Sequence, residues 1–148
     1  THPWNYYVLG LETRRKLLPT VISMAKEKAI KVGGEGANQS VNGAVSKIMD
    51  VPALIAVTTN LSPQDSFREE EDYAATVCSL HNLVLSLWDM GIGSQWSTGS
   101  VTRHPSTYSA LGIDGEKERI VGFLKAGYPE SIPRIEKKSY SEIRKYLP

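Results

Sequence analysis

The amino-acid sequence predicts an α+β protein. Three short runs are rich in β-branched and aromatic residues, which is typical of strands, and they lie at 4–9, 52–59 and 120–127. Between the second and third runs, residues 69–90 carry apolar side chains at spacings of three and four, which indicates a long helix. The segments between these elements hold further helix-like and turn-like patterns.

The composition excludes several classes of protein. With 148 residues the chain has the size of one domain, and we expect residues 1–148 to form it. A net charge of +1 gives no basis for a nucleic-acid-binding surface. The single cysteine, Cys78, lies among apolar residues, so we expect it in the core. No Cys or His pair has the spacing of a metal site. We find neither a signal peptide nor an apolar run of about 20 residues, so we expect a cytoplasmic protein without a membrane span.

The first strand is followed by a helix and then by a glycine-rich segment. Residues 12–31 have helical periodicity, in which Pro19 predicts a break because its ring clashes with the preceding turn. We expect both Arg14 and Arg15 on this helix to face solvent. Residues 33–45 combine four glycines with Asn, Gln and Ser, which favours a surface loop. If this loop had a function, it would be a lid over a nearby site.

The second strand and the long helix form the apolar centre of the sequence. The run at 52–59 is continuous and bounded by turn residues, as in a strand buried on both faces. The helix at 69–90 begins with an acidic cluster, which suits the positive end of the helix dipole. This helix is apolar nearly all round, whereas a small domain can bury only one face of it. We therefore expect a homodimer with this helix near the interface, and His81 in the core or interface.

The last part of the chain holds shorter elements. We expect a helix at 103–111 with Thr102 as its cap and His104 at its entry. A turn should separate this helix from the third strand at 120–127. A polar helix at 139–147 would pack on the surface or on a partner chain.

The stretch from Gly91 to Gly99 joins the long helix to the short one, and it reads Gly-Ile-Gly-Ser-Gln-Trp-Ser-Thr-Gly. Glycine has no Cβ, so a flat ligand can approach the backbone closely. Ser97 and Thr98 add hydroxyl groups, and their backbone N–H groups are free unless a β-ladder uses them. The alternative is a helix C-cap that continues into an ordinary loop. The residues themselves leave both interpretations open.

Four segments in this order resemble the nitroreductase-like family of FMN-dependent oxidoreductases, in particular its compact members. The segments are Thr1-His2-Pro3-Trp4 before a strand, Val51-Pro52-Ala53 at the start of an apolar strand, Gly91–Gly99 after the long helix, and Ile120–Pro129, which closes in Gly-Tyr-Pro. The resemblance covers nearly the whole chain. It implies a nitroreductase-like fold, with a central mixed and mainly antiparallel sheet flanked by helices, and a dimer with a long buried interface helix.

The resemblance also implies a function. FMN would pass electrons from NAD(P)H to a nitroaromatic, a quinone or a similar acceptor by a ping-pong mechanism. Because FMN supplies the redox chemistry, no catalytic side chain and no metal is implied. The residues that the resemblance places at FMN are His2, Gly91, Ile92, Gly93, Trp96, Ser97, Thr98, Gly99 and, at the phosphate, Arg134. Trp96 could equally be a core anchor, and Arg134 a solvated surface residue.

The chain departs from the family at its start. Members normally begin with a helix that carries an Arg-Arg-Ser segment for the flavin phosphate, followed by an Ala-Pro segment, whereas this sequence starts at Thr1. We expect that an N-terminal portion is missing from the chain. An alternative function is a protein of the same fold that binds FMN or another flat ligand without turnover, as a sensor or carrier. A dimeric α+β interaction protein is a third possibility.

Overall fold

The computed structural model of the protein describes residues 2–32 and 37–147. Its strands are β1 (Trp4–Val8), β2 (Ala53–Asn60), β3 (Gly93–Ser97) and β4 (Glu118–Gly127). Its α-helices are α1 (Leu11–Val32), α2 (Ala37–Met49), α3 (Ser66–Asp89), α4 (Pro105–Leu111) and α5 (Tyr140–Ile143), and a 3-10 helix, η1 (Ser100–Arg103), precedes α4.

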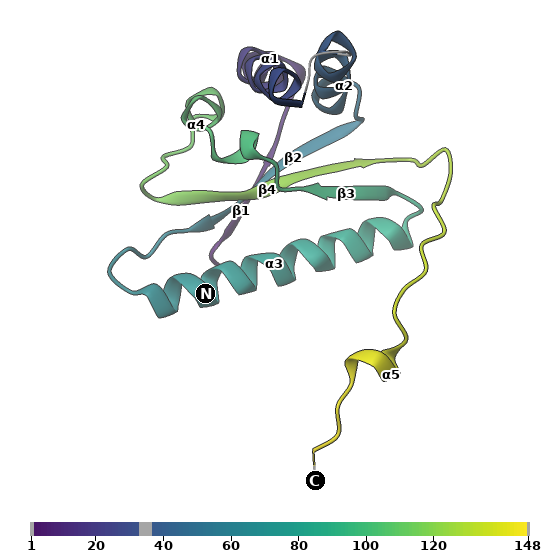
Figure 1. Ribbon diagram of the computed structural model, residues 1–148. Helices are drawn as coiled ribbons and strands as arrows, with labels where there is room; N and C mark the ends of the chain where they lie inside the picture. Colours follow the sequence, from purple (N-terminus) through teal and green to yellow (C-terminus); the bar gives the residue numbers. More distant parts are fainter. Residues whose placement is uncertain (1, 33–36, 148) are drawn as a thin grey trace.

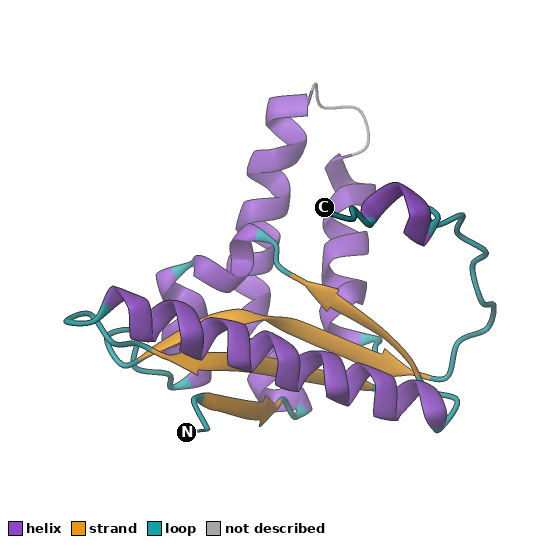
Figure 2. Cartoon of the chain, turned by 90° about the horizontal axis from the view of Figure 1, so that it is seen from below, coloured by secondary structure: helices purple, strands orange, loops and turns teal. Residues whose placement is uncertain are grey.

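The described strands form one sheet in the order β1-β2-β4-β3, in which every pairing is antiparallel. Helices α1, α2 and α4 cover one face of this sheet, and α3 runs across the other face (Figure 1). The view from below shows α3 lying in front of the strands (Figure 2). The α+β prediction is therefore confirmed, and β2 is a central strand as expected.

Two cores lie on the two faces of the sheet. On one face, α1 and α2 bury Leu17 and Ile48 against Phe123 of β4. On the other face, α3 buries Leu80 against Leu124, the next residue of β4. Successive side chains of a strand point to opposite faces, so a strand covered on both sides must be apolar at nearly every position. This explains the continuous apolar runs of β2 and β4.

Helix α1 differs from the expectation in two ways. It continues through Pro19, whose ring is exposed, so the prediction of a break was wrong. Arg14, expected in solvent, is only 5% exposed. Its Nε donates to the Leu9 carbonyl at 2.8 Å, its Nη1 to the Val51 carbonyl at 2.6 Å and its Nη2 to the Pro52 carbonyl at 3.3 Å. These carbonyl groups lie at strand ends, where Arg14 supplies donors that no neighbouring strand provides.

The glycine-rich segment is mostly helical. Residues 37–49 form α2, so the loop predicted for 33–45 was wrong from residue 37 onward, and 33–36 lie outside the described residues. Ala44 and Ile48 of α2 pack into the core beside α1. Packing against α1 thus outweighs the low helix propensity of Gly43 and its Asn neighbours. The hypothesis of a lid required a loop, so it no longer applies to residues 37–45, which are helical.

The stretch from Gly91 to Gly99 is partly a cap and partly a strand. Gly91 has a φ of 75°, and its N–H donates to the Trp88 carbonyl at 2.9 Å, while the Ile92 N–H donates to the Leu87 carbonyl at 2.9 Å. This pair of bonds ends α3 in a Schellman motif, which needs a left-handed residue such as glycine. From Gly93 the chain forms β3, so the prediction of a loop was wrong there. Among the described strands, β3 pairs only with β4 and is therefore an edge strand.

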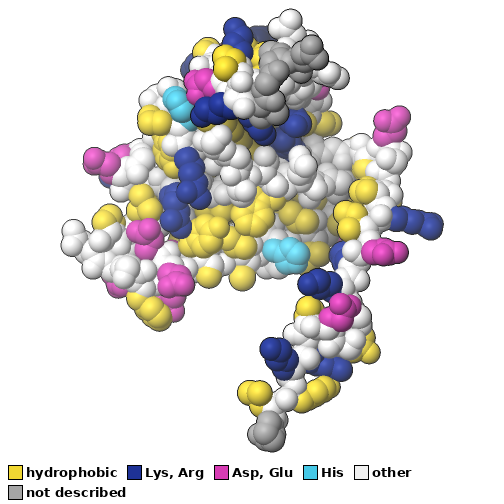
Figure 3. Space-filling model, in the orientation of Figure 1, with side chains coloured by type: hydrophobic (Ala, Val, Ile, Leu, Met, Phe, Trp, Pro, Cys, Tyr) yellow, Lys and Arg dark blue, Asp and Glu magenta, His cyan; other side chains and the backbone are white. Residues whose placement is uncertain are grey.

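Helix α3 buries only one face within a single chain. Asp72, Thr76 and Leu80 are buried, whereas Leu85 and Trp88 are 53% and 54% exposed. Cys78 is also exposed, contrary to the expected core position, and so is His81. Hydrophobic side chains form a continuous patch where α3 meets the sheet (Figure 3). Among the described helices, none has the length and apolar character that a membrane span requires.

The elements after β3 confirm some expectations and correct others. α4 starts at Pro105, and its cap is His104, whose Nδ1 accepts a hydrogen bond from the Ser106 N–H at 3.2 Å. Thr102 is not that cap, because it lies in η1 and its hydroxyl donates to the carbonyl of Gly99, the residue before η1. The polar helix near the C-terminus is limited to α5, and the segment that carries it extends away from the body of the molecule (Figure 1).

Candidate functional site

The edge strand β3 lies between two cavities. Successive side chains of a strand point to opposite faces, and here Ser97 points toward α1 and α2 while Trp96 and Thr98 point toward α3. The three residues predicted as one ligand-binding group therefore line two different cavities. We name these the lysine-lined cavity and the arginine-lined cavity.

The lysine-lined cavity has a volume of about 410 Å³ and lies between α1, α2, β3 and β4. Its apolar lining comes from Val21, Met24, Ala25, Ala44, Ile48, Val101 and Phe123. Its polar lining comes from Lys28, Gln39, Ser40, Lys47, Ser97, Gly99, Ser100 and Lys125. The charged groups among these lining residues are all lysines, so the cavity combines an apolar floor with a positive rim.

Two lysines of this cavity, Lys47 and Lys125, influence each other electrostatically. Burial, and to a smaller extent the positive charge of Lys47, lower the pKa of Lys125 below its usual value. The Lys125 ammonium donates to Oε1 of Gln95 at 3.4 Å, which is a neutral partner. An anion in the cavity would relieve the repulsion between the two ammonium groups. The cavity is therefore suited to a ligand with an apolar ring and a negative group.

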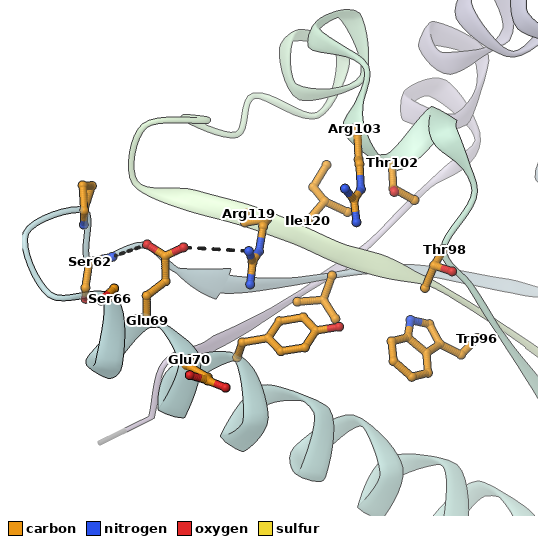
Figure 4. A pocket seen from close by; sticks show the side chains of 13 residues that line it. Ser62, Ser66, Glu69, Glu70, Trp96, Thr98, Thr102, Arg103, Arg119 and Ile120 are labelled. Carbon is orange, nitrogen blue, oxygen red and sulfur yellow. Dashed lines mark hydrogen bonds and ion pairs between the residues drawn. The ribbon is translucent and has the colours of Figure 1, made fainter.

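The arginine-lined cavity lies between α3, β4 and η1 and has a volume of about 790 Å³ (Figure 4). Arg119 stacks over the ring of Tyr73, with 4.8 Å from its Cζ to the ring centroid, and its Nη1 lies 3.8 Å from Oε1 of Glu69. Arg103 reaches into the same cavity from η1 (Figure 4). Glu70 also lines this cavity, so its charges are balanced, in contrast to those of the lysine-lined cavity.

A third cavity, of about 750 Å³, follows the outer edge of β3 toward the C-terminal segment. It is lined mainly by apolar groups, among them Trp88 of α3 and Ile132 of the C-terminal segment. Gly93, one of the predicted site residues, belongs to this cavity. A Cβ on Gly93 would lie 3.3 Å from Cβ of Pro129, so the two segments approach closely.

The remaining predicted site residues are dispersed. Gly91 and Ile92 form the turn between α3 and β3. His2 precedes β1, at the opposite edge of the sheet from β3, and its ring lies 5.2 Å from that of Trp4. Arg134 is exposed in the C-terminal segment. Within one chain, therefore, the structure brings Ser97 and Gly99 to the lysine-lined cavity, but not His2 or Arg134.

Sequence reasoning missed the lysines and arginines of these cavities. Lys47 lies near the end of α2, in a segment that follows the predicted loop, and Lys125 lies in a strand whose pairing the sequence does not reveal. The register of β3 with β4 places Gln95 opposite Lys125. Knowledge of that pairing would have identified Lys125 as a neighbour of the predicted ligand-binding stretch.

Comparisons with known proteins agree with this architecture. Residues 1–128 match the Nitroreductase family. The Bacillus subtilis (strain 168) protein named "Putative NAD(P)H nitroreductase YfhC" is 25% identical over 139 residues, which are 94% of this chain and 69% of that protein.

Solved structures of nitroreductase-like proteins are also similar to this chain. The crystal structure of a nitroreductase-like family protein from Bacillus cereus has a TM-score of 0.73 and 28% identity, covering 98% of this chain and 73% of the other. Oxidized iodotyrosine deiodinase bound to FMN and 3-iodo-L-tyrosine has a TM-score of 0.69 and 17% identity, covering 93% and 73%, which shows a likeness of fold. With most of its length matched by the family profile, the chain belongs to the nitroreductase family.

Proposed function

We propose that the protein is an FMN-dependent oxidoreductase that passes electrons from NAD(P)H to a nitroaromatic, a quinone or a similar acceptor. Family membership supports this proposal, as do the FMN bound to iodotyrosine deiodinase, a structural neighbour, and the NAD(P)H in the name of the Bacillus subtilis relative. The observation that carries the proposal is the lysine-lined cavity beside Ser97 and Gly99.

The chemistry of that cavity fits FMN. The phosphate of FMN carries roughly 1.5 to 2 negative charges at pH 7, and the pyrimidine edge of its ring gains negative charge on reduction. Lys47 and Lys125 would hold these negative groups, and Phe123 and Val101 would contact the apolar part of the ring. When bound, FMN supplies hydride transfer, and the chain orients the ring and keeps water from the side that faces the core.

The residues predicted from the sequence would take different parts in this site. Ser97 and Gly99 would contact FMN directly, because they line the lysine-lined cavity. Trp96 and Thr98 would contact it through their backbone groups, since their side chains line the other cavity. Assignment of Arg134 to the phosphate stays a prediction.

We also propose that two copies of the chain form a homodimer through α3. Its solvent-facing side carries apolar side chains that one chain leaves open, including Leu85 and Trp88. Burial of such side chains against a second copy would remove apolar surface from water. Assignment of His2 to FMN stays a prediction, because His2 lies at the opposite edge of the sheet from β3 within one chain.

The lysines provide the test of the FMN site. FMN is titrated into the purified protein and followed by its visible spectrum. Lys47→Gln and Lys125→Gln are each expected to raise the Kd about tenfold or more, because a hydrogen bond to a charged group contributes about 1.5–3 kcal/mol. Lys26→Gln, an exposed lysine of α1 that lines none of the three cavities, is the matched control and should leave the Kd unchanged. Equal affinity in all variants would contradict the proposed site.

Turnover distinguishes the enzyme from the alternative of a sensor or carrier. The FMN-loaded protein is mixed with NADH or NADPH and with menadione or a nitroaromatic compound. Oxidation of the nicotinamide that depends on the acceptor is the expected result. Bound FMN without any turnover would favour the sensor or carrier of the same fold.

A further inference from the structure

We propose that the arginine-lined cavity binds a planar aromatic carboxylate, with its ring between Trp96 and Tyr73 and its carboxylate at Arg103. This cavity lies between α3, β4 and η1, whereas the lysine-lined cavity lies between α1, α2, β3 and β4, and the two share no lining residue. The two sites are therefore separate, and this one does not depend on the binding of FMN.

Trp96 provides the first aromatic surface. Its indole fills the space above Gly122 of β4, where a Cβ would lie 2.2 Å from Nε1 and 2.7 Å from Cδ1 of the indole. Because residue 122 is a glycine, the indole of Trp96 can pack directly against the sheet. The side chain is nevertheless 40% exposed, and its open part lines the cavity. An indole supported on one side and open on the other is a stacking surface for a second ring.

Tyr73 provides the second aromatic surface, from α3. Tyr73 lines the same cavity as Trp96, and the apolar side chains of Ile120 and Val121 also belong to its lining. The guanidinium group of Arg119 lies over the Tyr73 ring, and its Nη1 is 3.8 Å from Oε1 of Glu69, so both contacts restrain the position of the ring. The Tyr73 side chain is therefore preorganised, which reduces the side-chain entropy that is lost when a ligand binds.

The charges of the cavity are arranged along its length. Glu69 and Glu70 lie at the end formed by the start of α3, and Trp96 and Thr98 lie at the other end (Figure 4). Glu69 is engaged by Arg119 and by the backbone N–H of Ser62, which donates to its Oε2 at 3.3 Å. Among the residues that the structure describes, Arg103 has no ion-pair partner, although it reaches toward the cavity.

The charges of this cavity favour a carboxylate over a phosphate as the ligand's negative group. The planar fork of an arginine binds a carboxylate through two parallel hydrogen bonds, and Arg103 has its donors available. A phosphate dianion would carry more charge into a cavity that Glu69 and Glu70 also line, so a single negative charge is favoured. A volume of about 790 Å³ accommodates a molecule of two fused rings.

The test is calorimetric titration of the protein with naphthalene-2-carboxylate and with its neutral amide, naphthalene-2-carboxamide. We expect the carboxylate to bind at least fivefold more tightly than the amide. Arg103→Gln should remove this preference while leaving the weaker binding of the amide within twofold. Arg103 is exposed, so the variant should fold normally, and its circular dichroism spectrum checks that. Arg15→Gln, an exposed arginine on α1, is the matched control and should keep the preference.

Titration in the presence of FMN separates this proposal from the proposed function. Saturating FMN should leave the affinity for naphthalene-2-carboxylate within twofold, and Lys47→Gln should leave it unchanged. Binding of the carboxylate by a protein that fails to bind FMN would support this site and contradict the FMN site. Competition between the carboxylate and FMN, or an unchanged preference in Arg103→Gln, would overturn the inference.

Discussion

Arg14 joins three elements through its guanidinium group. It is buried between the end of β1, the start of α1 and the start of β2, and its bonding partners are backbone carbonyl oxygens. An unpaired charge in this position would be costly, and the hydrogen bonds offset that cost. At the scale of single residues, the protein thus uses a buried cation to hold the ends of two strands, whereas the cations of the cavities are exposed or half-buried.

Removal of this buried cation should destabilise the fold strongly. Arg14→Ala leaves several buried carbonyl groups without donors, and we expect a loss of about 2–4 kcal/mol in the free energy of unfolding. Arg15→Ala, at the exposed neighbouring position, should change it by less than about 0.5 kcal/mol. Urea unfolding followed by circular dichroism measures both variants. A similar effect of the two substitutions would contradict the role of Arg14.

Substitution of Gly122 should also destabilise the fold. A methyl group in Gly122→Ala would overlap the Trp96 indole and approach the Ser97 carbonyl oxygen to 2.9 Å. We expect a loss of about 1–3 kcal/mol in the free energy of unfolding, as for other overpacked sites. In Gly10→Ala, the control, the added methyl group would meet no atom of the described residues within 4 Å. The double variant Gly122→Ala with Trp96→Ala should recover part of the loss, and no recovery would show that the indole is not the obstacle.

At the scale of elements, a polar cluster connects β1, β2 and β4. The carboxylate of Glu118 accepts hydrogen bonds from the Tyr7 hydroxyl at 2.9 Å, from Nδ2 of Asn5 at 3.1 Å and from the hydroxyl of Thr58. Asn5 and Tyr7 come from β1, Thr58 from β2 and Glu118 from β4. The cluster therefore fixes the strands relative to one another beyond their backbone ladders.

This cluster predicts a loss of stability at alkaline pH. Burial, followed by the hydrogen bond to Glu118 and its negative charge, raises the pKa of Tyr7 above its ordinary value of about 10. The unfolded chain then ionises first, so the contribution of Tyr7 is complete below about pH 10 and is lost as the pH rises through the folded-state pKa. Urea unfolding between pH 8 and pH 11 should show this decline. Tyr7→Phe should make the decline shallower, and an identical profile would contradict the assignment.

The elements differ in how far the sequence predicts them. β2 and α3 were predictable because a long apolar run and a helical repeat are local patterns. α2 was not, since Gly43 and the Asn residues disfavour an isolated helix, and only packing against α1 stabilises it. β3 was not predicted either, because Gly93–Ser97 has few β-branched residues and becomes a strand through its pairing with β4.

At the scale of the whole molecule, the apolar surface of α3 predicts self-association. Sedimentation equilibrium should give the mass of two chains. Leu85→Asp should shift the equilibrium toward the monomer, because it would place a charge in the proposed interface. Lys26→Asp, on the opposite side of the sheet, should not. A monomer at all concentrations, or a dimer unaffected by Leu85→Asp, would contradict the proposed interface.

The candidate site was only partly predictable at this scale. The stretch from Gly91 to Gly99 does lie beside cavities, since Ser97, Gly99, Trp96 and Thr98 all line one. That these residues divide between two faces follows from β3 being a strand, which the sequence did not indicate. The lysines come from α2 and β4, and only the tertiary fold brings them together.

A crystal structure of the protein with FMN tests the central claim most directly, because the claim concerns which face of β3 holds the cofactor. We expect the isoalloxazine ring in the lysine-lined cavity, with a negative group of FMN within hydrogen-bond distance of Lys47 or Lys125. FMN bound on the α3 face, between Trp96 and Arg103, would contradict the claim.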